Sequence, residues 1–339
     1  MSLLVLGIET SCDETAAAIV REDGSILSNV VLSQIKEHAK LGGVVPEISA
    51  RNHLTVLQAV IKEAMSQAHV SFESLSGVAA TCGPGLIGGV LVGSMMGKAI
   101  SAFHHKPFIA VNHLEGHALT ARLTNQVNFP YLLLLVSGGH TQLLKVLDVG
   151  KYVVLGTTLD DAVGECFDKV AKMLDLPYPG GPALEQLARG GDPAKFSFPR
   201  PLEHTHSCDF SFSGLKTAVR YALEKINKTE NVKADVAASF QQTVVEVLRK
   251  KVKVCLEQQP DLKIFVIAGG VGANEAIRSA LQAVCSDHGV VFCAPPQALC
   301  TDNGAMIAWV GVERLRKGWT SDLNFSPKPR WPLDFFEHS

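Results

Sequence analysis

The sequence predicts a duplicated α/β fold with a cleft between its two halves, and two observations support this prediction. First, strand-like apolar runs alternate along the chain with longer segments of helical period, which is typical of largely parallel sheets covered by helices. Second, a pattern of strand, polar turn and strand occurs twice, at 3–20 and at 131–146. We therefore divide the chain into an N-terminal part, 1–130, and a C-terminal part, 131–339.

The expected strands are short apolar runs bounded by glycine, proline or polar residues. They lie at 3–9, 77–82, 108–112, 131–137, 262–268 and 290–293. The clearest helical segments are 46–68, whose apolar side chains fall on one stripe, and 302–315. A third segment of helical pattern, 114–123, directly follows a predicted strand.

Each repeated hairpin contains a turn of small and polar residues, at 9–13 and at 137–141. Backbone N–H groups in such turns can bind phosphates, although both patterns are also compatible with ordinary β-hairpins. The stretch from about 156 to 230 has six prolines between 177 and 201. Because proline and glycine interrupt regular structure, we expect a loop-rich insertion there.

Composition excludes several classes of protein. The 339 residues are 47% hydrophobic and 19% charged, which indicates a globular chain. A formal net charge of -2 provides no overall positive field for nucleic acid, so any RNA contact needs a local patch or a partner. The eight cysteines form no C-x-x-C pair, and neither a signal peptide nor a membrane span is evident. We expect reduced thiols and a cytoplasmic protein.

The sharpest local motif is the histidine pair in HLEGH, residues 113–117. In a helix, His113 and His117 lie on one face, where a metal ion can bridge them. Glu115 points about 200° away from His113, so it cannot activate a water on that metal as the zincin glutamate does. The pair is also compatible with surface or capping histidines.

A third metal ligand has to come from elsewhere, and Asp302, at the start of the last predicted helix, is the best candidate. Two histidines and one carboxylate leave coordination positions open and suit Fe2+, while Zn2+ is also compatible. The alternative interpretation of Asp302 is a helix N-cap, a common position for aspartate.

Several glycine-rich segments resemble nucleotide motifs. GPGLIG at 83–88 imitates a dinucleotide fingerprint, but no acidic residue follows before position 115, so we reject NAD. The segment 93–99 is not a P-loop, because its glycines are too close together and Ala99 replaces the Ser or Thr. Gly89, Gly93 and Gly97 instead indicate a closely packed helix face.

Two further glycine turns, AGGVGAN at 268–274 and GGP at 180–182, could present the N-termini of helices to a phosphate or ribose. Glycine also occurs in such turns for shape alone.

Nine motifs occur in order along the chain: GIETSCDET (7–15), GPG (83–85), HLEGH (113–117), LVSGGHT (135–141), FDK (167–169), YPGGP (178–182), FSFSGLK (210–216), AGGVGAN (268–274) and CTDNG (300–304). Together they resemble the tRNA N6-adenosine threonylcarbamoyltransferase family, of the bacterial and mitochondrial type, formerly named O-sialoglycoprotein endopeptidases. The resemblance extends from about residue 4 to residue 332.

This resemblance implies an actin-like ATPase fold of the ribonuclease H-like class. It implies Fe2+, or Zn2+, on His113, His117 and Asp302. It also implies a nucleotide site for threonylcarbamoyl-AMP, or for ATP or ADP. That site comprises Leu135, Val136, Ser137, Gly138, Gly139, Asp168, Gly181 and Asn274.

The family transfers the threonylcarbamoyl group to N6 of the adenosine 3′ of the anticodon, in tRNAs that read codons beginning with A. The implied partners are tRNA and either a non-catalytic paralogue with a small ATPase or a second copy of the chain. We treat Asp168 and Lys169 as catalytic candidates, as donor-orienting and phosphate-neutralising groups respectively. Glu185 stands where many family members have a donor-contacting aspartate, so we leave it out of the site.

The residues leave two other activities open, a metalloendopeptidase and an actin-like small-molecule kinase. Candidate tRNA contacts are Arg189, Lys195, Arg200, His204, His206, Lys216 and Arg220. Nearby acidic residues nearly balance them, so an ordinary solvated surface is the alternative.

Overall fold

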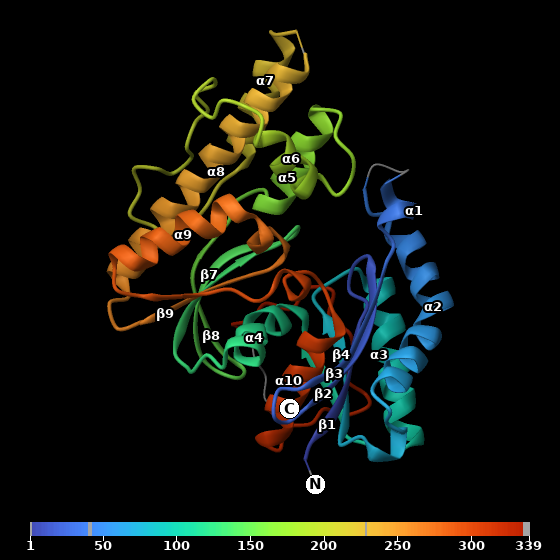
Figure 1. The fold of residues 1–339 in the computed structure, drawn as a ribbon. Helices are drawn as coiled ribbons and strands as arrows, with labels where there is room; N and C mark the ends of the chain where they lie inside the picture. The colour runs from blue at the N-terminus through green and yellow to red at the C-terminus, as the bar shows by residue number, and fades with distance from the viewer. Residues whose placement is uncertain (1, 40–42, 228, 335–339) are drawn as a thin grey trace. The chain divides into compact units, whose positions relative to one another are not determined.

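The computed structural model describes residues 2–39, 43–227 and 229–334, and the chain forms two compact units. The first unit contains the chain up to Val127, Asp148–Lys151 and the residues from Pro295 onward. The second contains Asn128–Leu147 and Tyr152–Ala294. Figure 1 shows the elements of both units.

The first unit is built on a five-stranded sheet of order β3-β2-β1-β4-β5. Its elements are β1 (Leu4–Glu9), β2 (Glu14–Arg21), β3 (Ile26–Ser33), α1 (Ile35–Ala39), α2 (Pro46–Gln67), β4 (Gly77–Gly83), α3 (Ile87–Phe103), β5 (Phe108–Asn112), α4 (His113–Asn125) and α10 (Gly304–Arg316). Strands β1, β2 and β3 pair antiparallel, while β1, β4 and β5 are parallel.

Helices cover both faces of this sheet, with α2 and α3 on one side and α10 on the other (Figure 1). Alternate residues of β4 show the two sides: Ala80 lies against Gly97 of α3, and Ala79 lies against Gly311 of α10. Gly89 and Gly93 of α3 pack directly on Thr10, so that a Cβ at either position would overlap atoms of Thr10. The predicted role of the α3 glycines in close packing is confirmed.

The second unit has a five-stranded sheet of order β10-β9-β6-β7-β8. Its elements are β6 (Tyr131–Val136), β7 (Thr141–Asp148), β8 (Lys151–Thr157), α5 (Val163–Met173), α6 (Gly180–Ala188), α7 (Ser213–Glu224), α8 (Glu230–Gln258), β9 (Ile264–Ala268), α9 (Glu275–Asp287) and β10 (Val291–Cys293). β6 and β7 pair antiparallel, and β6, β9 and β10 are parallel. One apolar core joins β6 and β9 to α5 and α8.

The predicted strands and the two predicted hairpins are present, but three expectations need correction. The sheets are mixed rather than largely parallel, because each contains a hairpin and a further strand, β3 or β8, that the sequence patterns did not indicate. The segment 156–230 is not mainly loop: it contains α5, α6 and α7, and its longest stretch without a helix is 189–212. The predicted C-terminal part, 131–339, also differs, because α10 packs on β1 and β2 of the first unit.

All eight cysteines are reduced thiols and six of them are buried, as expected. Burial raises the pKa of Cys82 and Cys285 to about 12. Among the described residues, no helix combines the length and the apolar character needed to cross a membrane.

Candidate functional site

Three side chains of the first unit that are far apart in sequence lie together. His113 and His117 are in the first turns of α4, and Asp302 directly precedes α10. The Nε2 atom of His117 is 3.0 Å from Asp302 Oδ1, and that of His113 is 3.5 Å from the same oxygen. The potential ligand atoms of the three residues all lie within 4.8 Å of one another.

Local structure at the start of α4 orients the two histidines. Asn112, the last residue of β5, caps the helix by accepting a hydrogen bond from the backbone N–H of Leu114 at 2.9 Å. The helix therefore begins at His113, and a spacing of four residues places both rings on one face, with centroids 4.8 Å apart.

Close backbone packing positions Asp302. A Cβ on Gly7 of β1 would overlap the backbone of Ala308, and one on Gly304 would approach the backbone of Ala17 in β2 to 2.6 Å. α10 therefore lies directly on the β1–β2 hairpin. The N-cap of α10 is Asn303, which accepts a hydrogen bond from Met306 N, so the N-cap interpretation of Asp302 is wrong.

Glu9, at the end of β1, contacts His113 from the side opposite Asp302, and the sequence patterns did not indicate it as a site residue. Glu9 Oε2 is 3.0 Å from His113 Nδ1. Burial by itself would raise the pKa of Glu9, but the adjacent His113 holds it below its ordinary value. Burial opposes the protonation of His113, yet Asp302 and Glu9 raise its pKa to about 9. The available sequence signal was a carboxylate ending an apolar strand, inside the first polar turn.

Glu115 points away from this cluster, as predicted. It is fully buried, accepts a hydrogen bond from Gly150 N at 2.9 Å and forms an ion pair with Arg314 of α10. Its partners leave it no access to the face shared by the two histidines.

The residues present fit a metal ion. The Nε2 atoms of His113 and His117 and a carboxylate oxygen of Asp302 face one another, and Asp302 is partly exposed. Glu9 lies on the other side of the His113 ring. Such a set of two histidines and one carboxylate leaves positions open for a substrate or water. It is compatible with Fe2+ and with Zn2+.

The predicted nucleotide residues all belong to the second unit, where they lie at the end of β6, in the β6–β7 turn, in α5, at the start of α6 and at the N-cap of α9. Leu135 and Val136 are buried in β6, and Ser137, Gly138 and Gly139 form the β6–β7 turn. A Cβ on Gly138 or Gly139 would meet no atom within 4 Å, so their backbone is open.

The end of β6 and the turn after it contact the N-terminus of α5 and the glycine turn that follows β9. The N–H of Gly164, in the first turn of α5, donates to Ser137 O at 3.3 Å. Gly269, which has φ of 92° and precedes α9, lies so close to Val136 that a Cβ would overlap its carbonyl oxygen. Only glycine suits this position.

The remaining nucleotide residues continue this chain of contacts. Asp168 Oδ1 accepts a hydrogen bond from Gly180 N at 2.8 Å, at the start of α6, and Gly181 beside it is open. Asn274 caps α9 by accepting from Ile277 N at 3.0 Å. Glu185 of α6, which we had left out of the site, accepts from Glu275 N at 2.8 Å. Asp168 thus links α5 to the start of α6, and Glu185 links α6 to the start of α9.

Lys169 has acidic partners. Its Nζ lies 2.7 Å from Glu165 and 3.4 Å from Asp161. Several candidate tRNA contacts are likewise paired with carboxylates: Arg189 with Glu275, Arg200 with Glu203 and Glu246, Lys216 with Asp161, and Arg220 with Glu224. This pairing favours the alternative of an ordinary solvated surface over a positive patch.

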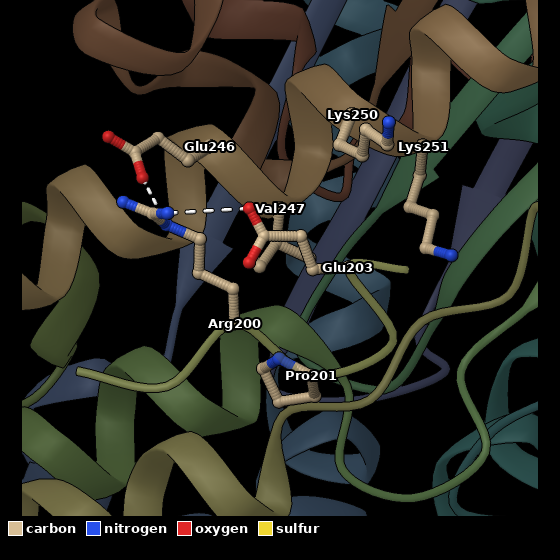
Figure 2. Close-up of a pocket in the computed structure, with 7 residues that line it drawn as sticks. All are labelled: Arg200, Pro201, Glu203, Glu246, Val247, Lys250 and Lys251. Carbon is tan, nitrogen blue, oxygen red and sulfur yellow. Dashed lines mark hydrogen bonds and ion pairs between the residues drawn. The ribbon is translucent and has the colours of Figure 1, made fainter. Parts of the chain in front are cut away.

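A small pocket lies between residues 200–203 and α8 (Figure 2). Arg200 contacts Glu203 and Glu246 there, and the buried Lys251 donates to Thr205 Oγ1 at 2.8 Å and to Ser207 O at 2.9 Å. The pocket contains none of the candidate metal or nucleotide residues, so we assign it no role in the site.

Comparison with known proteins identifies the family. Residues 25–309 match the family model of the tRNA N6-adenosine threonylcarbamoyltransferases. The chain is 57% identical to the protein of that name from Paramagnetospirillum magneticum, over 98% of this chain and 97% of that protein. The chain belongs to the tRNA N6-adenosine threonylcarbamoyltransferase family. The Rickettsia bellii member is 53% identical, over 97% of this chain and 98% of the relative.

Solved structures show that this threonylcarbamoyltransferase family member has a duplicated actin-like fold. HypF from T. kodakarensis superposes with a TM-score of 0.62 at 14% identity, over 93% of this chain and 48% of HypF. The activator of the 2-hydroxyisocaproyl-CoA dehydratase from Clostridium difficile has a TM-score of 0.52 at 15% identity, over 94% of this chain and 96% of the activator. At these identities the likeness concerns the fold alone. The family match favours neither the metalloendopeptidase nor the small-molecule kinase alternative.

Proposed function

We propose that this enzyme transfers the threonylcarbamoyl group from threonylcarbamoyl-AMP to N6 of the adenosine 3′ of the anticodon, in tRNAs that read codons beginning with A. The observation that carries the proposal is the identity of 57% to a named tRNA N6-adenosine threonylcarbamoyltransferase over nearly the whole of both chains. The clustering of His113, His117 and Asp302 and the linked turns of the second unit support it.

The histidine and carboxylate cluster would hold one metal ion, Fe2+ by resemblance to the family. When bound, such an ion supplies a Lewis acid that polarises the carbonyl of the carbamoyl group. His113 and His117 would bind through Nε2, and Asp302 through Oδ1. The leaving group of the donor is a phosphate, so the chain's own residues mainly have to bind and orient the two substrates.

The turns of the second unit would bind the adenylate donor. Gly138, Gly139 and Gly181 leave space for close approach to the backbone, and the N-termini of α5 and α6 favour a phosphate. Asp168 and Asn274 would orient the donor hydroxyls, since both side chains already brace neighbouring helix N-termini. ATP or ADP could use the same turns.

The family resemblance also supports a setting for the reaction. The enzyme would act in the cytoplasm with a non-catalytic paralogue and a small ATPase, or as a homodimer. Because many of its surface cations are paired with acids, such partners would supply part of the tRNA-binding surface.

The test is mass spectrometry of tRNA nucleosides. The chain is incubated with tRNA, threonine, bicarbonate, ATP and the partner proteins, or with tRNA and preformed threonylcarbamoyl-AMP. We expect threonylcarbamoyladenosine to form, and a strong chelator or His117→Ala to abolish it. A tRNA that lacks adenosine 3′ of the anticodon should remain unmodified.

Two results would contradict the proposal. Transfer from the preformed donor could fail although the metal-loaded protein is folded, or modification could continue unchanged in His117→Ala. The second result would favour a non-enzymatic role in a partner complex. Cleavage of a glycoprotein would favour the endopeptidase, and phosphorylation of a small molecule by Mg-ATP that persists in His117→Ala would favour the kinase.

A further inference from the structure

Glu9 occupies an unusual place for a carboxylate. It is fully buried at the end of β1, and its Oε2 atom is 3.0 Å from Nδ1 of His113. The Nε2 atom of that ring faces Asp302. Glu9 thus stands directly behind a proposed metal ligand, and the inference drawn from it rests on the metal centre of the proposed function.

Two donors hold the Glu9 carboxylate in place. The backbone N–H of Ser11 donates to Oε1 at 2.5 Å, and the hydroxyl of Thr81 in β4 donates to Oε2 at 2.5 Å. A carboxylate that accepts from both is suited to accept from His113 Nδ1 as well. With its hydrogen on Nδ1, the imidazole keeps its Nε2 lone pair for a metal ion. Ser11 Oγ, 3.1 Å from Nδ1, is compatible with the same tautomer.

The charge of Glu9 acts in the same direction. Among the described residues, its only ion-pair partner is His113, and no Lys or Arg reaches it. A buried anion on the far side of the imidazole favours a cation at Nε2, because water does not screen the interaction. Carboxylates behind metal-binding histidines raise ligand basicity in this way.

We propose that Glu9 is a positioning residue for the metal centre. Glu9 fixes the tautomer and orientation of His113, and Thr81 holds the Glu9 carboxylate in place by a hydrogen bond. The transfer reaction does not touch Glu9. Its effect is on the affinity and geometry of the bound cation.

The experiment measures metal affinity rather than activity. The full-length chain, stripped of metal, is titrated with Zn2+ and, under exclusion of oxygen, with Fe2+, in competition with a chromophoric chelator. We expect Glu9→Gln, which keeps the size of the side chain, to weaken metal binding about 10- to 100-fold.

Variants of Thr81 separate positioning from a general loss of structure. Thr81→Val removes the hydroxyl that holds Glu9, so we expect a smaller loss of metal affinity than in Glu9→Gln. Thr81→Ser keeps the hydroxyl and should retain the wild-type affinity. If Thr81→Val and Thr81→Ser bind metal with the same affinity, Thr81 does not hold Glu9 and that part of the proposal is overturned.

A matched control is available in Glu115, an equally buried carboxylate in α4 that pairs with Arg314 rather than with a ligand. Glu115→Gln should lower the unfolding temperature and leave metal affinity within about threefold, as should Glu313→Gln, which loses the pair with Arg122. Equal losses of affinity in Glu9→Gln and Glu115→Gln would show a merely structural role and overturn the proposal.

The outcomes also separate this inference from the metal centre itself. If the wild-type chain binds neither Zn2+ nor Fe2+, the proposed metal centre itself is wrong. A wild-type chain that binds metal, with unchanged affinity in folded Glu9→Gln, would overturn the role of Glu9 and leave the metal centre intact.

Discussion

The histidine cluster of the first unit and the glycine turns of the second differ in how they are built. His113, His117 and Glu9 are buried, and each is fixed by a contact to another element. Gly138 and Gly139 are exposed and their backbone borders open space. The first region is prepared for its ligand by side chains, and the second by the absence of side chains. The two regions should therefore fail in different ways.

The largest effect is expected when a side chain is removed from the histidine cluster. His117→Ala deletes a nitrogen that is 3.0 Å from Asp302, so metal content and transfer rate should both fall by more than about 100-fold. Metal analysis and tRNA nucleoside mass spectrometry measure the two losses. The exposed His206→Ala should retain its metal, and equal metal loss in both variants would contradict the assignment.

A large effect on stability is expected when a Cβ is added to Gly269, the glycine that packs against Val136. Gly269→Ala forces a Cβ against Val136 O at a positive φ. The free energy of unfolding should fall by about 1–3 kcal/mol. Denaturant unfolding measures it, while metal affinity, which depends on the first unit, should not change. An unchanged midpoint would contradict the expected crowding at this turn.

A moderate effect on donor affinity is expected when a Cβ is added to Gly139, whose backbone borders open space. Gly139→Ala meets no neighbour within 4 Å, so stability should change by less than about 0.5 kcal/mol. The methyl group would occupy the space assigned to the donor, and we expect its affinity to fall about tenfold. Calorimetry with a non-hydrolysable adenylate analogue measures this. Unchanged affinity would place the donor elsewhere.

The smallest effect is expected at Lys169. Its ammonium group pairs with Glu165 and Asp161 and is 39% exposed, so Lys169→Ala should cost no more than about 1 kcal/mol of stability. With its charge matched by two acids, we expect the transfer rate to change less than about threefold. A larger loss in steady-state kinetics, with donor affinity reduced, would support the phosphate-neutralising role of Lys169.

At the histidine cluster, some residues could be predicted from the sequence and others could not. The helical spacing of His113 and His117 and the opposite direction of Glu115 follow from helix geometry alone, and both are present in the structure. The proximity of Asp302 came from one acidic residue at a helix start combined with a family resemblance. Glu9 and Thr81 were missed because their contacts join β1, β4 and α4, and no local spacing encodes them.

The segment 156–230 shows where local patterns mislead. Its prolines indicated loops, yet Pro179 is the N-cap of α6 and Pro182 lies in the first turn. Proline is tolerated at these positions, since the first N–H groups of a helix have no partner within it. The return of α10 to the first unit was not evident from local patterns either, because it depends on contacts of Gly7 in β1 with α10 and of Gly304 in α10 with β2.

The order of the chain has a consequence for biosynthesis. Both histidines have been made when little more than a third of the chain is translated, whereas Asp302 and α10 follow only after the whole second unit. A ribosome-bound nascent chain can therefore offer at most a two-nitrogen site. For the proposed metal centre, binding of the ion by all three residues would be completed only after the last helix leaves the exit tunnel, so metal acquisition would be one of the final steps in maturation.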